Sequence, residues 1–119
     1  MPMRSSTSSV RRWPDRDTVL RAVRAWATER AHEHAELRRV GVFGSAARGD
    51  YGVGSDVDLV AIVTHADRAF AERSSAWPTE RLPVPADFLL YTEDEWQKLL
   101  AQDTRFARML RDETLWVWP

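Results

Sequence analysis

The apolar positions of the chain gather in three short segments, and each of these segments predicts a β-strand. Leu37–Phe43 is rich in valine and phenylalanine and stops at Gly44. Val57–Val63 is apolar on both faces once past Asp58, which is typical of a strand in the middle of a sheet. Residues 84–91 alternate regularly, with Val84, Ala86, Phe88 and Leu90 on one face and Asp87, Leu89 and Tyr91 on the other.

A second periodicity, of three and four residues, predicts helices around these strands. The first helix is capped by Asp15 or Asp17 and runs to about residue 34. Residues 46–48 have room for one helical turn, and the glycines that follow predict a loop. Residues 66–77 have a helical composition, and three prolines break the pattern after them.

The C-terminal third adds two more helices and completes the predicted fold class. Thr92 and Glu95 form a capping box at the start of one helix, and another helix covers residues 104–112. Leu115–Trp118 fits either a short final strand or an apolar tail. The order α-β-β-α-β-α-α predicts an α/β (α+β) fold, a small mixed β-sheet flanked by helices.

Composition narrows the class of protein without identifying an activity. A chain of 119 residues suits one domain, which we expect at residues 13–119, preceded by a disordered leader rich in serine and arginine at residues 1–12. The 17 basic and 18 acidic residues nearly balance, which argues against nonspecific binding to nucleic acid or to a membrane. No cysteine is present for a disulfide or a thiolate metal site. No run is apolar enough for export or membrane insertion, so we expect a cytoplasmic protein.

Two carboxylates, Asp56 and Asp58, interrupt the apolar pattern where Val57–Val63 begins. Residues two apart in a strand point the same way, with Cα atoms about 7 Å apart, so both carboxylates project from one face. Unpaired carboxylates at this spacing repel each other, and burial strengthens the repulsion. A hard divalent cation between them, Mg²⁺ or Mn²⁺, would remove it. Because Mg²⁺ is commonly shared between carboxylates and substrate phosphates, the pair points to a nucleotide.

The residues before these acids fit the binding of phosphate. Gly44 lets the backbone turn tightly and approach a ligand, and Ser45 offers a hydroxyl and an N–H group where a short helix begins. Arg48 either contacts the same phosphates or fixes the loop through an ion pair. Ser55 is grouped with these nucleotide-binding positions because, as a turn residue, it shapes the approach to Asp56.

The spacing Gly44-Ser45, ten residues, then Asp56-x-Asp58 resembles the signature of the DNA polymerase β-like nucleotidyltransferase superfamily. Within it, the chain is similar to the minimal nucleotidyltransferases, a subgroup that includes MntA-type antitoxins paired with HEPN-domain toxins. The signature occupies residues 44–58, and the order of elements matches the family over roughly residues 19–91. The strings that carry the likeness are Gly44-Ser45-Ala46-Ala47-Arg48-Gly49 and Ser55-Asp56-Val57-Asp58-Leu59.

The resemblance implies a site and its cofactors. Asp56 and Asp58, with a third acid from a neighbouring strand, hold two divalent metal ions and are the catalytic residues, with ATP as the nucleotide substrate. Asp87 is the candidate for the third acid, because it interrupts an otherwise apolar strand and follows the first two acids at a plausible distance along the chain. Pro85 is unusual this close to a strand residue and leaves the register open.

The resemblance also implies an activity and a partner. The chain would transfer AMP from ATP to a hydroxyl of a HEPN-type toxin and so act as its antitoxin, with the acceptor presented by that partner. Two alternatives stay open: an antitoxin that neutralises its toxin by binding alone, and a subunit of a small-molecule nucleotidyltransferase. We expect no direct contact with nucleic acid or membrane. Trp116 and Trp118 hint at a partner surface in the C-terminal segment.

Overall fold

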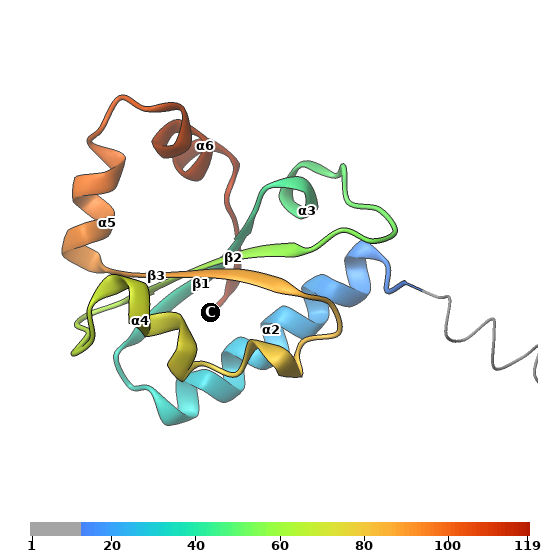
Figure 1. The fold of residues 1–119 in the computed structure, drawn as a ribbon, viewed down its shortest axis with the longest axis horizontal. Coiled ribbons are helices and arrows are strands. Elements are labelled where there is room, and N and C mark those ends of the chain that lie inside the picture. The colour runs from blue at the N-terminus through green and yellow to red at the C-terminus, as the bar shows by residue number, and fades with distance from the viewer. Residues whose placement is uncertain (1–12) are drawn as a thin grey trace, which may run out of the picture.

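The computed structural model describes residues 13–119, and the leader expected at residues 1–12 lies outside the described residues. These residues form a four-stranded mixed sheet with helices on both faces, which is the predicted fold class (Figure 1). In chain order the elements are α2 (Arg16–Glu33), β1 (Leu37–Phe43), α3 (Ser45–Arg48), β2 (Val57–Val63), α4 (Phe70–Arg73), the 3-10 turns η1 (Ser74–Ala76) and η2 (Thr79–Arg81), β3 (Ala86–Thr92), α5 (Glu93–Leu100), α6 (Arg105–Glu113) and β4 (Leu115–Trp118).

The strands lie side by side in the order β3-β2-β1-β4. β1 pairs antiparallel with both β2 and β4, whereas β2 and β3 run parallel. The predicted interior position of β2 is therefore confirmed, and Leu115–Trp118 is a strand and not a tail. Pro85 does not disturb the register, because its carbonyl accepts a hydrogen bond from the N–H of Val57 (2.9 Å) just before β3 begins.

Alternation along the strands divides the apolar side chains between two cores, one on each face of the sheet. α2 packs against one face with Val19, Val23 and Trp26, all at most 3% exposed. On the opposite face, α5 and α6 contribute Trp96 and Leu110 (Figure 1). Each such buried side chain contributes about 1.5–3 kcal/mol to the free energy of unfolding, so together they hold the helices on the sheet.

Side-chain caps fix where the helices begin. The Asp15 carboxylate accepts from the N–H of Thr18 (2.8 Å), which selects Asp15 over Asp17 as the cap of α2. The predicted capping box of Thr92 and Glu95 is present at the start of α5. No helix of the described residues combines the length and the apolar character that crossing a membrane requires.

The helix predicted over residues 66–77 is wrong in part. Only Phe70–Arg73 is α-helical, Ser74–Ala76 is a 3-10 turn, and Ala69 has extended backbone angles. The cause is a long-range anchor that composition does not reveal. Arg73 is buried, and its Nε donates back to the carbonyl of Arg68 (2.8 Å), which holds the residues before Phe70 out of the helix.

The same arginine ties this segment to α5, and the link should make stability depend on pH. Arg73 donates to both carboxylate oxygens of Glu95, at 2.6 and 3.1 Å, and this lowers the pKa of Glu95 to about 2. The pair therefore stabilises the fold fully above the ordinary pKa of 4.5, and the contribution is lost as the pH falls toward 2.

We expect Arg73→Met to lower the free energy of unfolding by about 1.5–3 kcal/mol at pH 7, because half-buried Glu95 and the carbonyls of Arg68 and Leu90 lose a charged donor. Glu95→Gln should destabilise the protein at pH 7, and its difference from the parent should shrink as the pH is lowered from 5 to 3. Urea denaturation at both pH values measures this, with exposed Glu80→Gln as the control. A pH-independent difference between Glu95→Gln and the parent would contradict the ion-pair account.

Candidate active site

The structure brings Asp58 and Asp87 together on neighbouring strands. They are direct register partners in the parallel pair of β2 and β3, so their carboxylates leave the sheet from adjacent positions. Asp56 lies immediately before β2 begins. Alternation puts Asp58 on the same face of the sheet as Val60, and Asp87 on the same face as Leu89, which is the face that α5 and α6 cover further along.

The surroundings of Asp58 disfavour its charge. Its side chain is half-buried, whereas Asp56 and Asp87 are exposed. Burial raises the pKa of Asp58 above its usual range, and the negative charges of Asp87 and then Asp56 raise it further. Arg48 opposes this shift only in part. A carboxylate held in this way gains from a cation placed among the three acids.

β1 ends beside these acids and turns sharply at Gly44. Phe43, its last residue, is the register partner of Asp58. Gly44 then has a φ of 72°, a conformation that favours glycine, and α3 starts at Ser45. A Cβ atom on Gly44 would collide with Oδ2 of Asp58. The glycine thus allows the start of α3 to lie directly against the carboxylate.

Arg48 and Ser55 both have partners in the loop after α3, and Arg48 has a second partner in α6. Arg48 forms ion pairs with Asp50 (3.1 Å) and with Glu113 at the end of α6 (3.6 Å). The hydroxyl of Ser55 accepts from the N–H of Gly52 (3.1 Å). These contacts favour the alternative in which Arg48 and Ser55 shape the loop. Contact of either side chain with a nucleotide stays a prediction.

Comparison with known protein families identifies the family of this chain. Residues 26–116 match the nucleotidyltransferase domain family, and this span includes every predicted site residue. The chain belongs to this family. No curated protein sequence matches the chain.

Solved structures share the fold of this nucleotidyltransferase domain. One is a protein of Sulfolobus solfataricus provisionally described as a nucleotidyltransferase, with 20% identity, a TM-score of 0.62, and coverage of 85% of this chain and 80% of that one. Another is a toxin–antitoxin structure with AMP-PNP, with 16% identity, a TM-score of 0.53, and coverage of 80% of this chain and 72% of that one.

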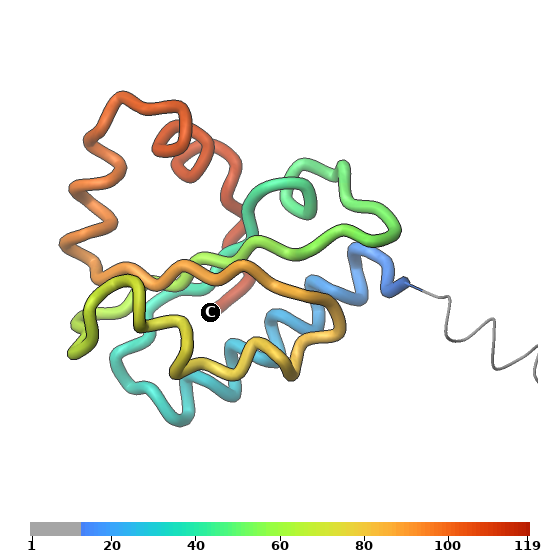
Figure 2. The backbone as a smooth tube through the Cα atoms, viewed as in Figure 1, coloured from blue at the N-terminus to red at the C-terminus, as the bar shows by residue number. Residues whose placement is uncertain are grey.

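A contact that the sequence does not reveal links α2 to the nucleotidyltransferase signature. The Nε of Arg16 donates to the carbonyl of Ala46 in α3 (2.5 Å). Beside it, the indole N–H of Trp13 donates to the Tyr51 hydroxyl (2.9 Å), which in turn donates to the carbonyl of Pro14 (3.1 Å). Figure 2 shows the loop between α3 and β2 lying against the start of α2. No local pattern could predict this, because Arg16 is simply the first residue of a helix.

We expect Arg16→Met to weaken the binding of ATP about tenfold, because α3 loses a charged hydrogen bond that holds it in place. Arg16→Lys keeps a donor and should recover part of the loss. Arg21→Met on the exposed side of the same helix is the matched control. Equal ATP affinity in Arg16→Met and in the control, measured by calorimetry, would contradict a role for Arg16 in positioning α3.

Two of the three predicted metal ligands, Asp58 and Asp87, lie on adjacent strands, and the binding of a divalent cation stays a prediction. Among residues 13–119, no three or more histidine, aspartate or glutamate side chains are grouped closely enough to hold a metal ion. What favours the cation is the chemistry of the acids present. Asp58 and Asp87 are adjacent, all the donors are carboxylate oxygens, and the pKa of Asp58 is raised by burial and by its acidic neighbours.

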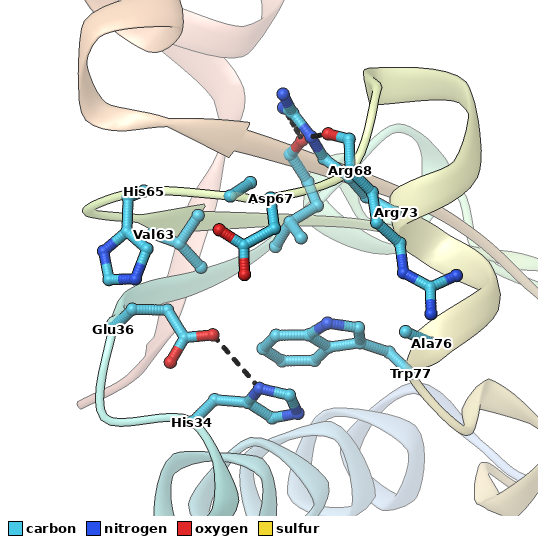
Figure 3. Close-up of a pocket in the computed structure, with 11 residues that line it drawn as sticks. His34, Glu36, Val63, His65, Asp67, Arg68, Arg73, Ala76 and Trp77 are labelled. Atoms are coloured by element: carbon cyan, nitrogen blue, oxygen red, sulfur yellow. Dashed lines mark hydrogen bonds and ion pairs between the residues drawn. The ribbon is translucent and has the colours of Figure 1, made fainter.

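A separate hollow lies at the opposite end of the sheet, beyond the last residue of β2 (Figure 3). His34 stacks on Trp77 with ring centroids 4.2 Å apart, and its Nδ1 lies 3.1 Å from a carboxylate oxygen of Glu36. Arg73, also at its wall, is engaged by Glu95. The hollow contains none of the predicted site residues, so it does not belong to the nucleotidyltransferase signature.

Proposed function

We propose that this domain transfers a nucleoside monophosphate, AMP from ATP, to a hydroxyl group with the help of Mg²⁺ or Mn²⁺. The observation that carries the proposal is the pairing of Asp58 with Asp87 in register, directly beside the turn at Gly44 and Ser45. Carboxylates that repel one another next to a glycine-lined turn suit a substrate that brings both cations and phosphates. Membership of the nucleotidyltransferase domain family supports the reaction class.

Each residue then has a part in the transfer. The hydroxyl of Ser45 and the N–H groups at the start of α3 hold the β- and γ-phosphates, so that the α-phosphate faces the acceptor. Asp56, Asp58 and Asp87 would hold the metal ions. Asp87 is exposed, so its carboxylate oxygen can take the proton of the acceptor hydroxyl. The new bond joins the acceptor oxygen to the α-phosphorus, and pyrophosphate leaves.

The metal ions supply two effects when bound, a lower pKa for the acceptor hydroxyl and neutralisation of charge on the departing pyrophosphate. The protein's contribution is to place its carboxylates where these effects act. Asp58 is the central ligand in this arrangement, because it is the register partner of both Phe43, the residue before Gly44, and Asp87.

We further propose that the acceptor is a HEPN-type toxin and that the chain is its antitoxin. The support is the signature at residues 44–58, together with the fold shared with a toxin–antitoxin structure that contains AMP-PNP. No residue of the site identifies adenine or the acceptor by itself. The acceptor therefore has to be identified by finding which molecule receives the nucleotide label.

Two labels on ATP test the proposal. The chain is incubated with Mg²⁺ and ATP labelled on either the α- or the γ-phosphate, with and without a HEPN-domain toxin as the partner protein. We expect the α-label, and not the γ-label, on the partner protein. Transfer of the γ-label would show phosphoryl transfer instead. Neutralisation of the toxin without any transferred label would favour neutralisation by binding alone.

A further inference from the structure

β4 forms one edge of the sheet, and among the described strands only β1 pairs with it. An edge strand exposes unpaired N–H and C=O groups along its outer side, and most proteins cover or charge such an edge. Here the sequence is Leu-Trp-Val-Trp, and Leu115 is 39% exposed. The edge therefore offers both backbone hydrogen bonds and apolar surface to another chain.

β4 is held firmly on its inner side. Gly41 of β1 leaves room for it, since a Cβ there would come within 2.6 Å of the Thr114 side chain and 2.8 Å of the Trp116 ring. Trp116 packs edge-to-face on Trp96, with centroids 5.6 Å apart, and the Arg39 guanidinium lies 4.0 Å from the Trp116 ring centre. Because these contacts fix the strand, its outer edge is already in place for pairing.

A groove of about 290 Å³ runs beside this edge, between β4 and α2. Its walls include Leu20, Arg21 and Arg24 from α2 and Leu115, Val117 and Pro119 from the C-terminal strand and its end. Arg21 and Arg24 are exposed, no ion pair of the described residues involves either of them, and no acidic residue lines the groove. The groove is thus apolar with a positive rim.

We propose that the β4 edge binds an extended segment of a partner protein, which adds to the sheet as a further strand and carries acidic side chains at alternate positions. Side chains two apart in a strand are about 7 Å apart on one face. Arg21 and Arg24 are one turn apart, about 4.5 Å along the helix axis, and their flexible side chains span the difference. Two acids of the incoming strand can therefore reach both arginines, while backbone pairing with β4 supplies affinity.

Charge decides against a second copy of this chain as the occupant. Pairing of β4 with β4 of another copy would bring Arg21 and Arg24 of both copies to one interface, with no acid in either groove to offset them. The inference depends only on the edge and its groove. It holds or fails independently of the proposed nucleotidyl transfer, whose residues lie in the turn before α3, at the start of α3, at the start of β2 and in β3.

Three capped seven-residue peptides test this inference. One alternates valine and glutamate, the second has lysine in place of glutamate, and the third keeps the glutamates but has proline at its centre. Amide chemical shifts of the labelled chain are followed by NMR. We expect the glutamate peptide to shift the β4 amides and to bind about tenfold more tightly than either of the others.

Charge reversal supplies the specific control. Arg21→Glu with Arg24→Glu should weaken the glutamate peptide about tenfold and favour the lysine peptide, whereas exposed Arg81→Glu should change affinity by less than about twofold. Equal binding of all three peptides, shifts outside β4 and α2, or no binding at about 1 mM peptide would overturn the proposal. So would sedimentation showing a dimer that the double substitution disrupts.

Discussion

Asp58→Asn is expected to lower the rate of nucleotide transfer by about 10²–10³-fold, as when a group that stabilises charge in the transition state is removed. Asparagine has nearly the same shape, so packing against Phe43 and Gly44 should survive. The substitution removes the negative charge of Asp58, which lies against the turn at Gly44 and beside Asp87 on the next strand. Single-turnover transfer of the α-label from ATP measures the effect.

The stability of this variant separates a catalytic loss from misfolding. Burial and the neighbouring acids raise the pKa of Asp58, so removing its charge should leave the protein at least as stable as the parent. Asp87→Asn should also lower turnover, with a smaller effect on nucleotide binding, because its role is on the acceptor side. Asp94→Asn, an exposed acid of α5, is the matched control and should keep full activity. If Asp58→Asn transfers nucleotide at the parental rate, the Asp58 carboxylate has no role in the proposed mechanism.

Gly44→Val is expected to lower the rate of nucleotide transfer about as much as Asp58→Asn does. Its φ of 72° is strained for any residue with a Cβ, and that atom would collide with the carboxylate of Asp58. Either the turn moves away from the phosphates or Asp58 moves away from the metal ions. Both outcomes should appear as a large loss of ATP affinity, measured by calorimetry on folded protein.

Gly52→Ala is the control for this change. A Cβ at Gly52 meets no atom within 4 Å, and its φ lies outside the left-handed region, so nucleotide affinity should stay near that of the parent. The account of the turn fails if Gly44→Val folds and transfers nucleotide at the parental rate, or if the two glycine substitutions behave alike.

Local patterns predict much of the fold and of the candidate site. β1 and β2 have the bounds that their valine-rich sequences predict, because strands with one or two buried faces have few alternative registers. Asp87 could be singled out because an acid interrupts an apolar strand, and it does lie opposite Asp58. Thr92 and Glu95 predict the start of α5 correctly, because a capping box depends only on residues three apart in the sequence.

What the sequence could not predict depends on contacts between residues far apart in the chain. Arg73 shortens the helix expected at residues 66–77 by reaching the Arg68 carbonyl and Glu95. Arg16 donates to the carbonyl of Ala46, which is 30 residues away in the chain. Arg48 of α3 forms an ion pair with Glu113 at the end of α6. Long, flexible arginine side chains find such partners only in the folded structure, so composition around each arginine carries no sign of them.

The most direct test of the central claim is whether ATP binding requires a divalent cation held by Asp58. Calorimetry compares the parent and Asp58→Asn, each titrated with ATP in Mg²⁺ and in EDTA. We predict that Mg²⁺ strengthens ATP binding to the parent strongly and that Asp58→Asn loses most of this gain. Equal ATP affinity of the parent with and without Mg²⁺ would contradict the assignment of Asp56, Asp58 and Asp87 as a metal-dependent nucleotide site.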